Sequence, residues 1–327
     1  MATSAIIKRV RESARQVLER AEFVRLDQNR LAACAASLQP AEVKARYYFE
    51  EDFHFKSDGR ALLDYVFTLA AVNFGSGFSP QWKAHRRGQS TYKSIAATFK
   101  TYAEENHSLN ATFAARVQSQ ELAGLFGVPP EMPLMEMFAK SLNQLGWLVE
   151  DEYDGEYANL LDSLEGPEVA ANLVQLLTSQ LSYFDDRAIY RGEPVYFYKR
   201  AQILANDLYL AFNGVGFGDI PDIANLTSFA DNLVPHFFRV EQVLEYEAGL
   251  AERIESGELL TSGSPEEVEI RAAGVYCVEE VCRLLNERST GPAEQIFPAQ
   301  LDVYLWNKAQ TPRYKSRPRH LTTTYFY

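Results

Sequence analysis

The chain has 327 residues, of which 46% are hydrophobic and 13% aromatic, so it can bury a large core. Its formal net charge of −12, from 32 basic and 44 acidic residues, argues against a protein that grips a nucleic-acid backbone over a broad basic surface. Three cysteines without regular spacing give no disulfide framework and favour a reducing, cytoplasmic setting.

Helical periodicity dominates the N-terminal half of the chain. Apolar residues recur on one face of 5–21, with Thr3 or Ser4 as the helix N-cap, and the charges in this stretch distinguish it from a signal peptide. A small β element is expected near 44–56 or around the turn at 73–82. Because the sequence holds no run of about 18 apolar residues, we expect no membrane span. Further helices are predicted at 59–75, 90–106, 110–127, 132–153 and 167–181.

The middle of the C-terminal half is predicted to contain one buried helix and a glycine-rich turn. The segment 186–212 starts with a stretch that could be a strand, PVYFYK, and continues as a buried helix over 198–212. The following FNGVGFGDI (212–220) contains three glycines but lacks the G-x-G-x-x-G spacing and the preceding strand of a dinucleotide-binding loop. It is therefore interpreted as a turn between helices.

Two further helices are predicted before the C-terminus. The first, at 264–288, opens with a capping box formed by Ser264 and Glu267, and the second covers 298–310. The fold class is therefore mainly α, and we expect one compact domain over residues 1–327. The basic residues that follow the last helix leave room for a small anionic ligand; they are Arg313, Lys315, Arg317 and Arg319.

Asp231 is hard to explain by packing alone. It lies in SFADNLVPHFFR (228–239), which has the apolar rhythm of a helix, where a bare carboxylate is rarely buried. The layout of a turn, a short helix and then a helix carrying Asp231 is similar to the helix-hairpin-helix segment of DNA glycosylases, where a catalytic aspartate stands just past the hairpin. The alternative is a structural aspartate, at the start or in the middle of a helix, that accepts hydrogen bonds from backbone donors.

The other polar candidates show no metal-site spacing. None of the five histidines is paired at such a spacing, and there is no C-x-x-C or H-E-x-x-H motif, so we expect no metal. His236 follows Asp231 by five residues, and we expect it near the same face. Asp302 and Trp306 share a helix face, where a core tryptophan beside an exposed carboxylate is the plain alternative. Glu269 and Arg271 most simply supply a helix salt bridge.

Several of these stretches together resemble the queuosine salvage proteins, which are queuosine 5′-phosphate N-glycosidases or hydrolases. The resembling blocks, in the family's order, are VNFG (72–75), YKRAQIL (198–204), SFADNLVP (228–235), EVEIRAAGVYCVE (267–279), LDVYLW (301–306) and the closing RPRHLTTTYFY. The chain departs from the family where GSGFSPQW replaces a Phe-Trp pair and where Asn307 stands at a position at which aspartate is common.

The resemblance implies a helical fold related to DNA glycosylases and a hydrolase that releases queuine, a 7-deazaguanine base, from queuosine 5′-monophosphate without a cofactor. It implies that Asp231 is the catalytic carboxylate at the ribose C1′, acting as a nucleophile or as an electrostatic stabiliser for attack by water. It also implies that Phe229 stacks on the base. The other implied substrate-binding residues are Asp302, His54 and Asn73 towards base or diol, Lys199 and His236 towards the 5′-phosphate, and Trp306, Phe74 and Asn307.

Two other functions stay open at this point. A DNA-repair glycosylase would need a basic groove, against which the net charge argues. A non-catalytic binding protein for a modified nucleoside would keep the aromatic pocket without turnover. The expected partner is the small-molecule substrate, with no direct binding of nucleic acid or membrane, and the sequence does not determine the oligomeric state.

Overall fold

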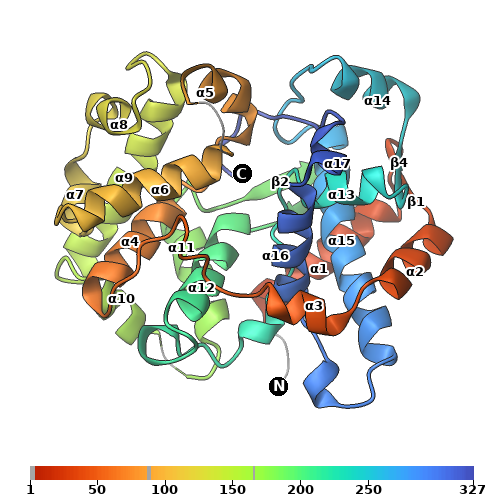
Figure 1. The fold of residues 1–327 in the computed structure, drawn as a ribbon, viewed down its shortest axis with the longest axis horizontal. Coiled ribbons are helices and arrows are strands. Elements are labelled where there is room, and N and C mark those ends of the chain that lie inside the picture. The colour runs from red at the N-terminus through yellow and green to blue at the C-terminus, as the bar shows by residue number, and fades with distance from the viewer. Residues whose placement is uncertain (1–3, 87–89, 165) are drawn as a thin grey trace. The chain divides into compact units, whose positions relative to one another are not determined.

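The computed structural model describes residues 4–86, 90–164 and 166–327, and these are mainly helical (Figure 1). The chain divides into two compact units whose segments alternate along the sequence, so each unit combines stretches that are far apart in the chain. Unit 1 comprises Met1–Tyr48, Asp186–Gln202 and Asp222–Thr323; unit 2 comprises Phe49–Asp185, Ile203–Pro221 and Thr324–Tyr327. The single domain expected over 1–327 stays a prediction.

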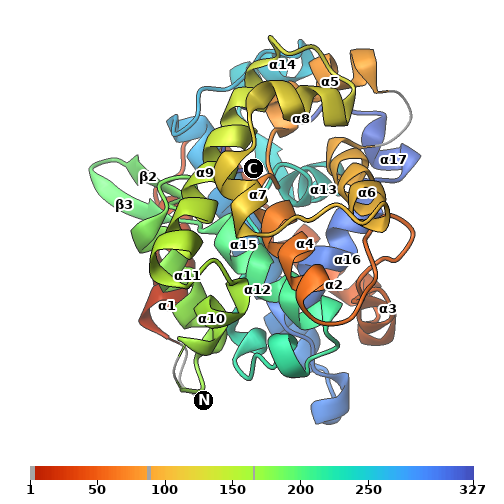
Figure 2. The same cartoon turned by 90° about the vertical axis from the view of Figure 1, so that its left-hand side faces the viewer.

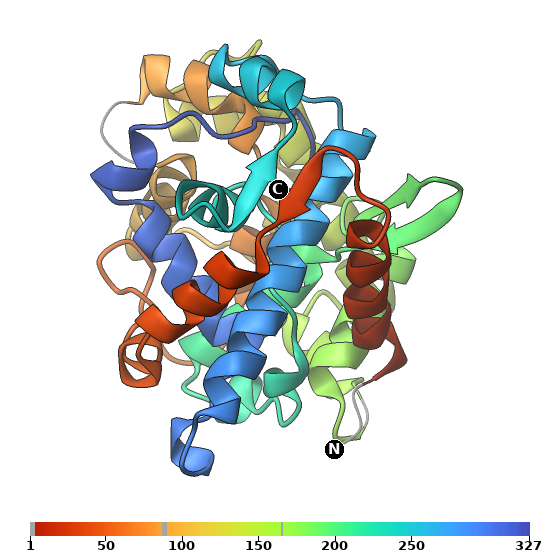
Figure 3. The same ribbon diagram turned by 90° about the vertical axis from the view of Figure 1, so that its right-hand side faces the viewer.

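Unit 1 is built around one long helix, α15. This helix packs against α1, α2, α13 and α16, and Figure 3 shows it in blue beside the two red N-terminal helices. It is buried on several faces, and the charged side chains of Glu267, Glu269 and Arg271 therefore lie in the interior. The elements that begin in unit 1 are α1 (Ala5–Leu18), β1 (Val24–Leu26), α2 (Gln28–Ser37), α3 (Pro40–Ala45), β2 (Arg187–Tyr190), β3 (Glu193–Tyr196), α12 (Lys199–Ala211), η3 (Ile223–Asn225), α13 (Val234–Val240), β4 (Leu244–Tyr246), α14 (Ala248–Glu255), α15 (Pro265–Glu287), η4 (Pro292–Glu294), α16 (Pro298–Ala309) and α17 (Pro312–Lys315).

The strands of unit 1 form two small antiparallel pairs. β1 pairs with β4, although about 220 residues separate them, and β2 pairs with β3 as a hairpin. The hairpin turn consists of Arg191 and Gly192, whose φ angles of 50° and 84° suit a type I′ turn. The strand considered at PVYFYK is thus confirmed for its first three residues, which belong to β3. The β element expected near 44–56 or 73–82 is wrong, since the described residues there have no strand partner and 73–82 instead forms a 3-10 turn and a helix start.

Unit 2 consists of helices and irregular segments within the described residues. α7 crosses α9 closely at Gly146, where an added Cβ would come within 2.1 Å of the backbone nitrogen of Ala115, and Figure 2 shows the two helices overlapping. Its elements are α4 (Arg60–Ala71), η1 (Ser76–Phe78), α5 (Ser79–His85), α6 (Thr91–Glu104), α7 (Ala111–Arg116), α8 (Ser119–Phe126), α9 (Pro133–Glu152), α10 (Tyr157–Asp162), α11 (Val169–Gln180) and η2 (Gly216–Gly218).

The predicted helices are confirmed with two exceptions, one of which, the helix expected to carry Asp231, is described with the site below. The helix expected over 110–127 is two helices, because the chain becomes extended at Val117 and Gln118. The backbone N–H of Gln118 then donates to the carboxylate of Glu121 at 2.7 Å, which caps the second helix. Within the described ranges no single helix is long and apolar enough to cross a membrane; α4 and Ser76–His85, with a 70° bend between them, meet the length and composition criteria only as a pair.

Candidate active site around Asp231

Asp231 stands immediately before α13, in an irregular loop. Its Oδ1 accepts hydrogen bonds from the backbone N–H groups of Leu233 (2.9 Å) and Val234 (3.0 Å), which the helix itself leaves without partners. The helix starts here because Pro235, which has no N–H, fits only the first turn. The prediction that Asp231 lies on a helix is therefore wrong, and its geometry matches the alternative of an aspartate at a helix N-terminus.

The charge of Asp231 is set by two opposing influences. Burial, to 8% exposure, raises the pKa of its carboxyl, whereas the helix N–H groups and the cations Lys199 and Arg319 lower it. Burial likewise lowers the pKa of Lys199 to about 8, although attraction to Asp231 opposes that fall. Both cations therefore favour the ionised carboxylate. Arg319 is not among the site residues predicted from the sequence, although it belongs to the basic cluster near the C-terminus that could bind an anion.

Hydrogen bonds to side chains of α12 and α16 fix three consecutive residues of the loop before Asp231. The backbone N–H of Thr227 donates to Oε1 of Gln202 at 2.9 Å. Oδ2 of Asp302, on α16, then accepts hydrogen bonds from Oγ of Ser228 (2.5 Å) and from the backbone N–H of Phe229 (2.9 Å). Two predicted site residues, Phe229 and Asp302, are thus in direct contact. These contacts order a segment that has no regular secondary structure of its own.

Asp302 is buried and Trp306 is half-buried. The alternative of an exposed carboxylate beside a core tryptophan is therefore wrong, since the carboxylate is the more buried of the two side chains. Burial raises the pKa of Asp302, and the negative charge of Asp231 raises it further. Two neighbouring carboxyl groups in a dry site do not both ionise readily. Asp231 has two backbone N–H donors and two cations, whereas Asp302 has one of each beside the hydroxyl of Ser228, so the charge resides on Asp231 and the proton on Asp302.

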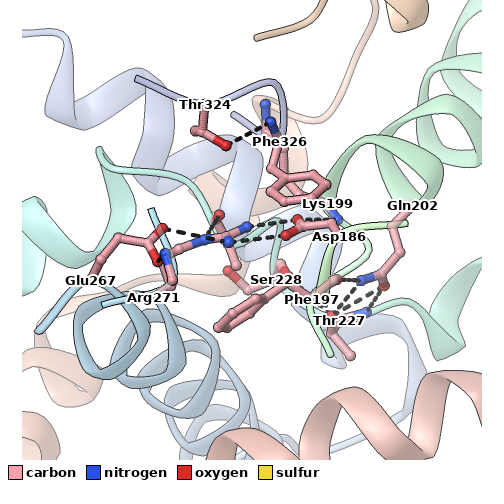
Figure 4. A network of polar contacts seen from close by, with 12 residues as sticks. Asp186, Phe197, Lys199, Gln202, Thr227, Ser228, Glu267, Arg271, Thr324 and Phe326 are labelled. Atoms are coloured by element: carbon pink, nitrogen blue, oxygen red, sulfur yellow. Dashed lines mark hydrogen bonds and ion pairs between the residues drawn. The ribbon is translucent and has the colours of Figure 1, made fainter. Parts of the chain in front are cut away.

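Arg271, on α15, lies at the centre of a buried network (Figure 4). Its Nη1 and Nη2 donate to Asp186 at 3.0 and 2.6 Å, and its Nε donates to the carbonyl oxygen of Ala230 at 3.0 Å. A helix ion pair is present as expected, but it joins Arg271 to Glu267 at 3.6 Å, since the carboxylate of Glu269 binds elsewhere. The main partner, Asp186, could not be identified from local spacing.

His236 makes a structural hydrogen bond from α13. Its Nε2 lies 2.9 Å from the carbonyl oxygen of Tyr314, and burial lowers the pKa of the imidazole to about 4. The ring is therefore neutral near pH 7, with its proton on Nε2, and Nδ1 is a buried acceptor that has no partner among the described residues. An acceptor does not suit a phosphate oxygen, so the predicted phosphate contact has no support from this geometry.

Three of the predicted site residues lie in unit 2. His54 is buried, with Nδ1 3.0 Å from the hydroxyl of Tyr65 and Nε2 3.4 Å from that of Tyr92, and burial lowers the pKa of its imidazole. Asn73 is half-buried just after α4, and Phe74 is buried. The substrate contacts of these residues stay predictions.

Asn307, the last predicted site residue, is half-buried on α16 in unit 1. Seven of the ten predicted residues thus belong to unit 1, which contains Asp231, Phe229, Asp302, Lys199, His236, Trp306 and Asn307. Across the described residues, no three His, Cys, Asp or Glu side chains gather where they could hold a metal ion.

Comparison with known proteins agrees with the resemblance seen in the sequence. Residues 53–327 match the family model described as queuosine salvage protein. The chain is 36% identical over 319 residues to the queuosine 5′-phosphate N-glycosylase/hydrolase of Sphaerobacter thermophilus, covering 96% of each chain. It is 30% identical over 336 residues to the protein of the same name from Mus musculus, covering 97% of this chain and 98% of the mouse protein. The chain therefore belongs to the queuosine salvage protein family.

Proposed function

We propose that this protein hydrolyses the N-glycosidic bond of queuosine 5′-monophosphate and releases queuine. The observation that carries the proposal is the buried carboxylate of Asp231, which is fixed by the start of α13 and favoured in its ionised form by Lys199. This carboxylate occurs in a chain whose relatives are named queuosine 5′-phosphate N-glycosylase/hydrolase.

The proposed chemistry places Asp231 at the ribose C1′. Cleavage of the N-glycosidic bond develops positive charge on the sugar, and a carboxylate in a poorly screened site stabilises that charge strongly. Oδ1 is occupied by the helix N–H groups, so Oδ2 is the oxygen that faces the reacting carbon. Asp231 either attacks C1′ to form a glycosyl ester that water then hydrolyses, or stabilises the cation while water attacks directly.

The leaving group makes this carboxylate more important. Position 7 of a 7-deazaguanine is carbon, so protonation at N7 cannot assist departure of the base. The remaining sources of assistance are stabilisation of the sugar cation and contacts to other edges of the base. Asp302 contributes indirectly, since it holds the loop through Ser228 and Phe229 and, as the protonated member of the pair, leaves the negative charge on Asp231.

Substrate recognition forms the finer part of the proposal. Phe229 stacks on the base, a contact that contributes about 1–3 kcal/mol in comparable sites. Lys199 binds the 5′-phosphate in addition to its attraction to Asp231. We further propose a cytoplasmic protein that binds the free nucleotide and neither nucleic acid nor membrane, since the net charge is −12 and all three cysteines are free thiols.

The test is Asp231→Asn. An asparagine Oδ1 can still accept the two hydrogen bonds of α13, so the variant should fold, while queuine release should fall about 100-fold or more because the charge is lost. Asp27→Asn is the matched control, since Asp27 caps α2 through the backbone N–H of Arg30 and lies in the same unit. Release of queuine is measured by chromatography and folding by circular dichroism. A folded Asp231→Asn protein that keeps the wild-type rate removes the proposal.

A further inference from the structure

We infer that Arg271 is a positioning residue for this reaction: it sets the orientation of Asp231 and couples it to the backbone at Lys199. The inference rests on the proposed function in one respect, that Asp231 is the reacting carboxylate. The sequence offered only a helix salt bridge for Arg271, and the contacts of its guanidinium show a more specific arrangement.

The first contact acts on the peptide bond that precedes Asp231. The carbonyl of Ala230 accepts the hydrogen bond from Nε of Arg271 at 3.0 Å, and Ala230 is buried. Because a peptide unit is planar, fixing this carbonyl also fixes the nitrogen and Cα of Asp231. The loop has no helix or strand ladder at this point, so this hydrogen bond, together with those that Oδ1 accepts at the start of α13, sets the direction in which the Asp231 side chain leaves the backbone.

The second contact connects Arg271 to the other charged residue of the site. Both terminal nitrogens of Arg271 donate to Asp186, and Oδ2 of Asp186 also accepts the backbone N–H of Lys199 at 3.2 Å. Figure 4 shows Asp186 between Arg271 and Lys199. One buried ion pair therefore holds the backbone at both ends of the Asp231–Lys199 pair.

The arrangement requires an arginine. Three donors of one planar group point at three acceptor atoms, the two carboxylate oxygens of Asp186 and the carbonyl oxygen of Ala230. The guanidinium also lies 4.0 Å from the ring centroid of Phe197. A lysine ammonium would keep the charge but cannot form the fork to Asp186 and reach Ala230 as well. Buried ion pairs often contribute little to stability compared with apolar side chains of the same volume, which favours a role in geometry over a role in folding alone.

The test compares Arg271→Lys with Glu269→Gln. Glu269 is a matched control because it is a buried charge on the same helix, where it binds the backbone N–H groups of Phe23 and Val24 and the hydroxyl of Tyr190. We expect Arg271→Lys to lower kcat about 10- to 100-fold, since a misplaced reacting group slows the chemical step, and to raise KM for queuosine 5′-monophosphate by a smaller factor, since Lys199 also binds the phosphate. Glu269→Gln should lower Tm without lowering kcat.

The pH–rate profile separates positioning from a general loss of structure. Lys199 lowers the pKa of Asp231, so a loosened pair should move the acid limb of kcat to higher pH in Arg271→Lys. If that protein does not fold, Asp186→Asn carries the test with the same readouts, because it weakens the same fork.

The outcomes distinguish the two proposals. If wild type releases queuine, Asp231→Asn does not, and a folded Arg271→Lys or Asp186→Asn protein keeps wild-type kcat and the wild-type profile, the inference is overturned and the function stands. A kcat loss in Glu269→Gln equal to that in Arg271→Lys also overturns it. Absence of release by wild type removes the proposed function itself.

Discussion

Burial of the neutral imidazole of His236 makes the stability of the protein depend on pH. Burial lowers the pKa of His236 from 6.5 to about 4, so the folded state takes up this proton only below about pH 4. The unfolded chain takes it up below about pH 6.5. Between these values the unfolded state binds more protons, so the stabilisation is complete above pH 6.5 and is lost as the pH falls towards 4.

The magnitude follows from the two pKa values. A difference of about 2.5 pH units, at about 1.36 kcal/mol each, corresponds to about 3 kcal/mol for complete protonation. Between pH 7 and pH 4.5 about 2 kcal/mol of this is lost. His236→Gln removes the titration while the side-chain amide can still donate to the carbonyl of Tyr314, so the variant should lose about 2 kcal/mol less than wild type over this range.

The assay is urea unfolding at pH 7 and pH 4.5, at low protein concentration because the pI is about 5.0. His85→Gln removes an exposed imidazole and is the control. Equal losses for wild type and His236→Gln would refute the reasoning. The same variant should also leave unchanged the ratio of kcat/KM for queuosine 5′-monophosphate to that for queuosine, since the neutral imidazole offers the phosphate no donor.

Three further predictions follow from the packing and charges. Gly146→Ala should destabilise the protein by about 1–3 kcal/mol or more, because its Cβ would clash with the backbone of Ala115. Gly124→Ala has open space around it in α8 and should stabilise the protein by about 0.5–1 kcal/mol. Thermal unfolding measures both changes, and equal shifts in Tm would contradict the argument. The pKa of Asp302 is raised, so the folded state must give up this proton as the pH rises, and wild type should lose stability between pH 6 and pH 9. Asp302→Asn should lose less. Equal losses of unfolding free energy in urea for the two proteins would disprove this. The pKa of Lys199 is lowered to about 8, so wild-type kcat/KM should fall above that pH. Lys199→Met should be slower than wild type at pH 7, and its kcat/KM should not change on the alkaline side of the pH–rate profile. If the variant keeps the wild-type fall at high pH, the ammonium of Lys199 is not its cause.

Local signals in the sequence determined most of the helices and pointed to several residues of the candidate site. Apolar periodicity and capping residues act within one or two turns, so α1, α9 and α15 could be predicted from their own residues. The family blocks pointed to Asp231, Phe229 and Asp302, and the structure places these three around one loop. The helices follow from residues close together in the sequence, and the site residues from the order of the family blocks along the chain.

The tertiary structure decided what depends on partners far away in the sequence. Asp231 lies before α13 and not within it, because its carboxylate and Pro235 set the helix start and because α16 supplies Asp302 to the preceding loop. Arg271 pairs with Asp186, which is 85 positions away in the sequence, and the sequence separation between the paired strands β1 and β4 is longer still. A hydrogen bond or strand pairing between such segments leaves no periodicity in either one, so only the folded chain shows which donors and acceptors meet.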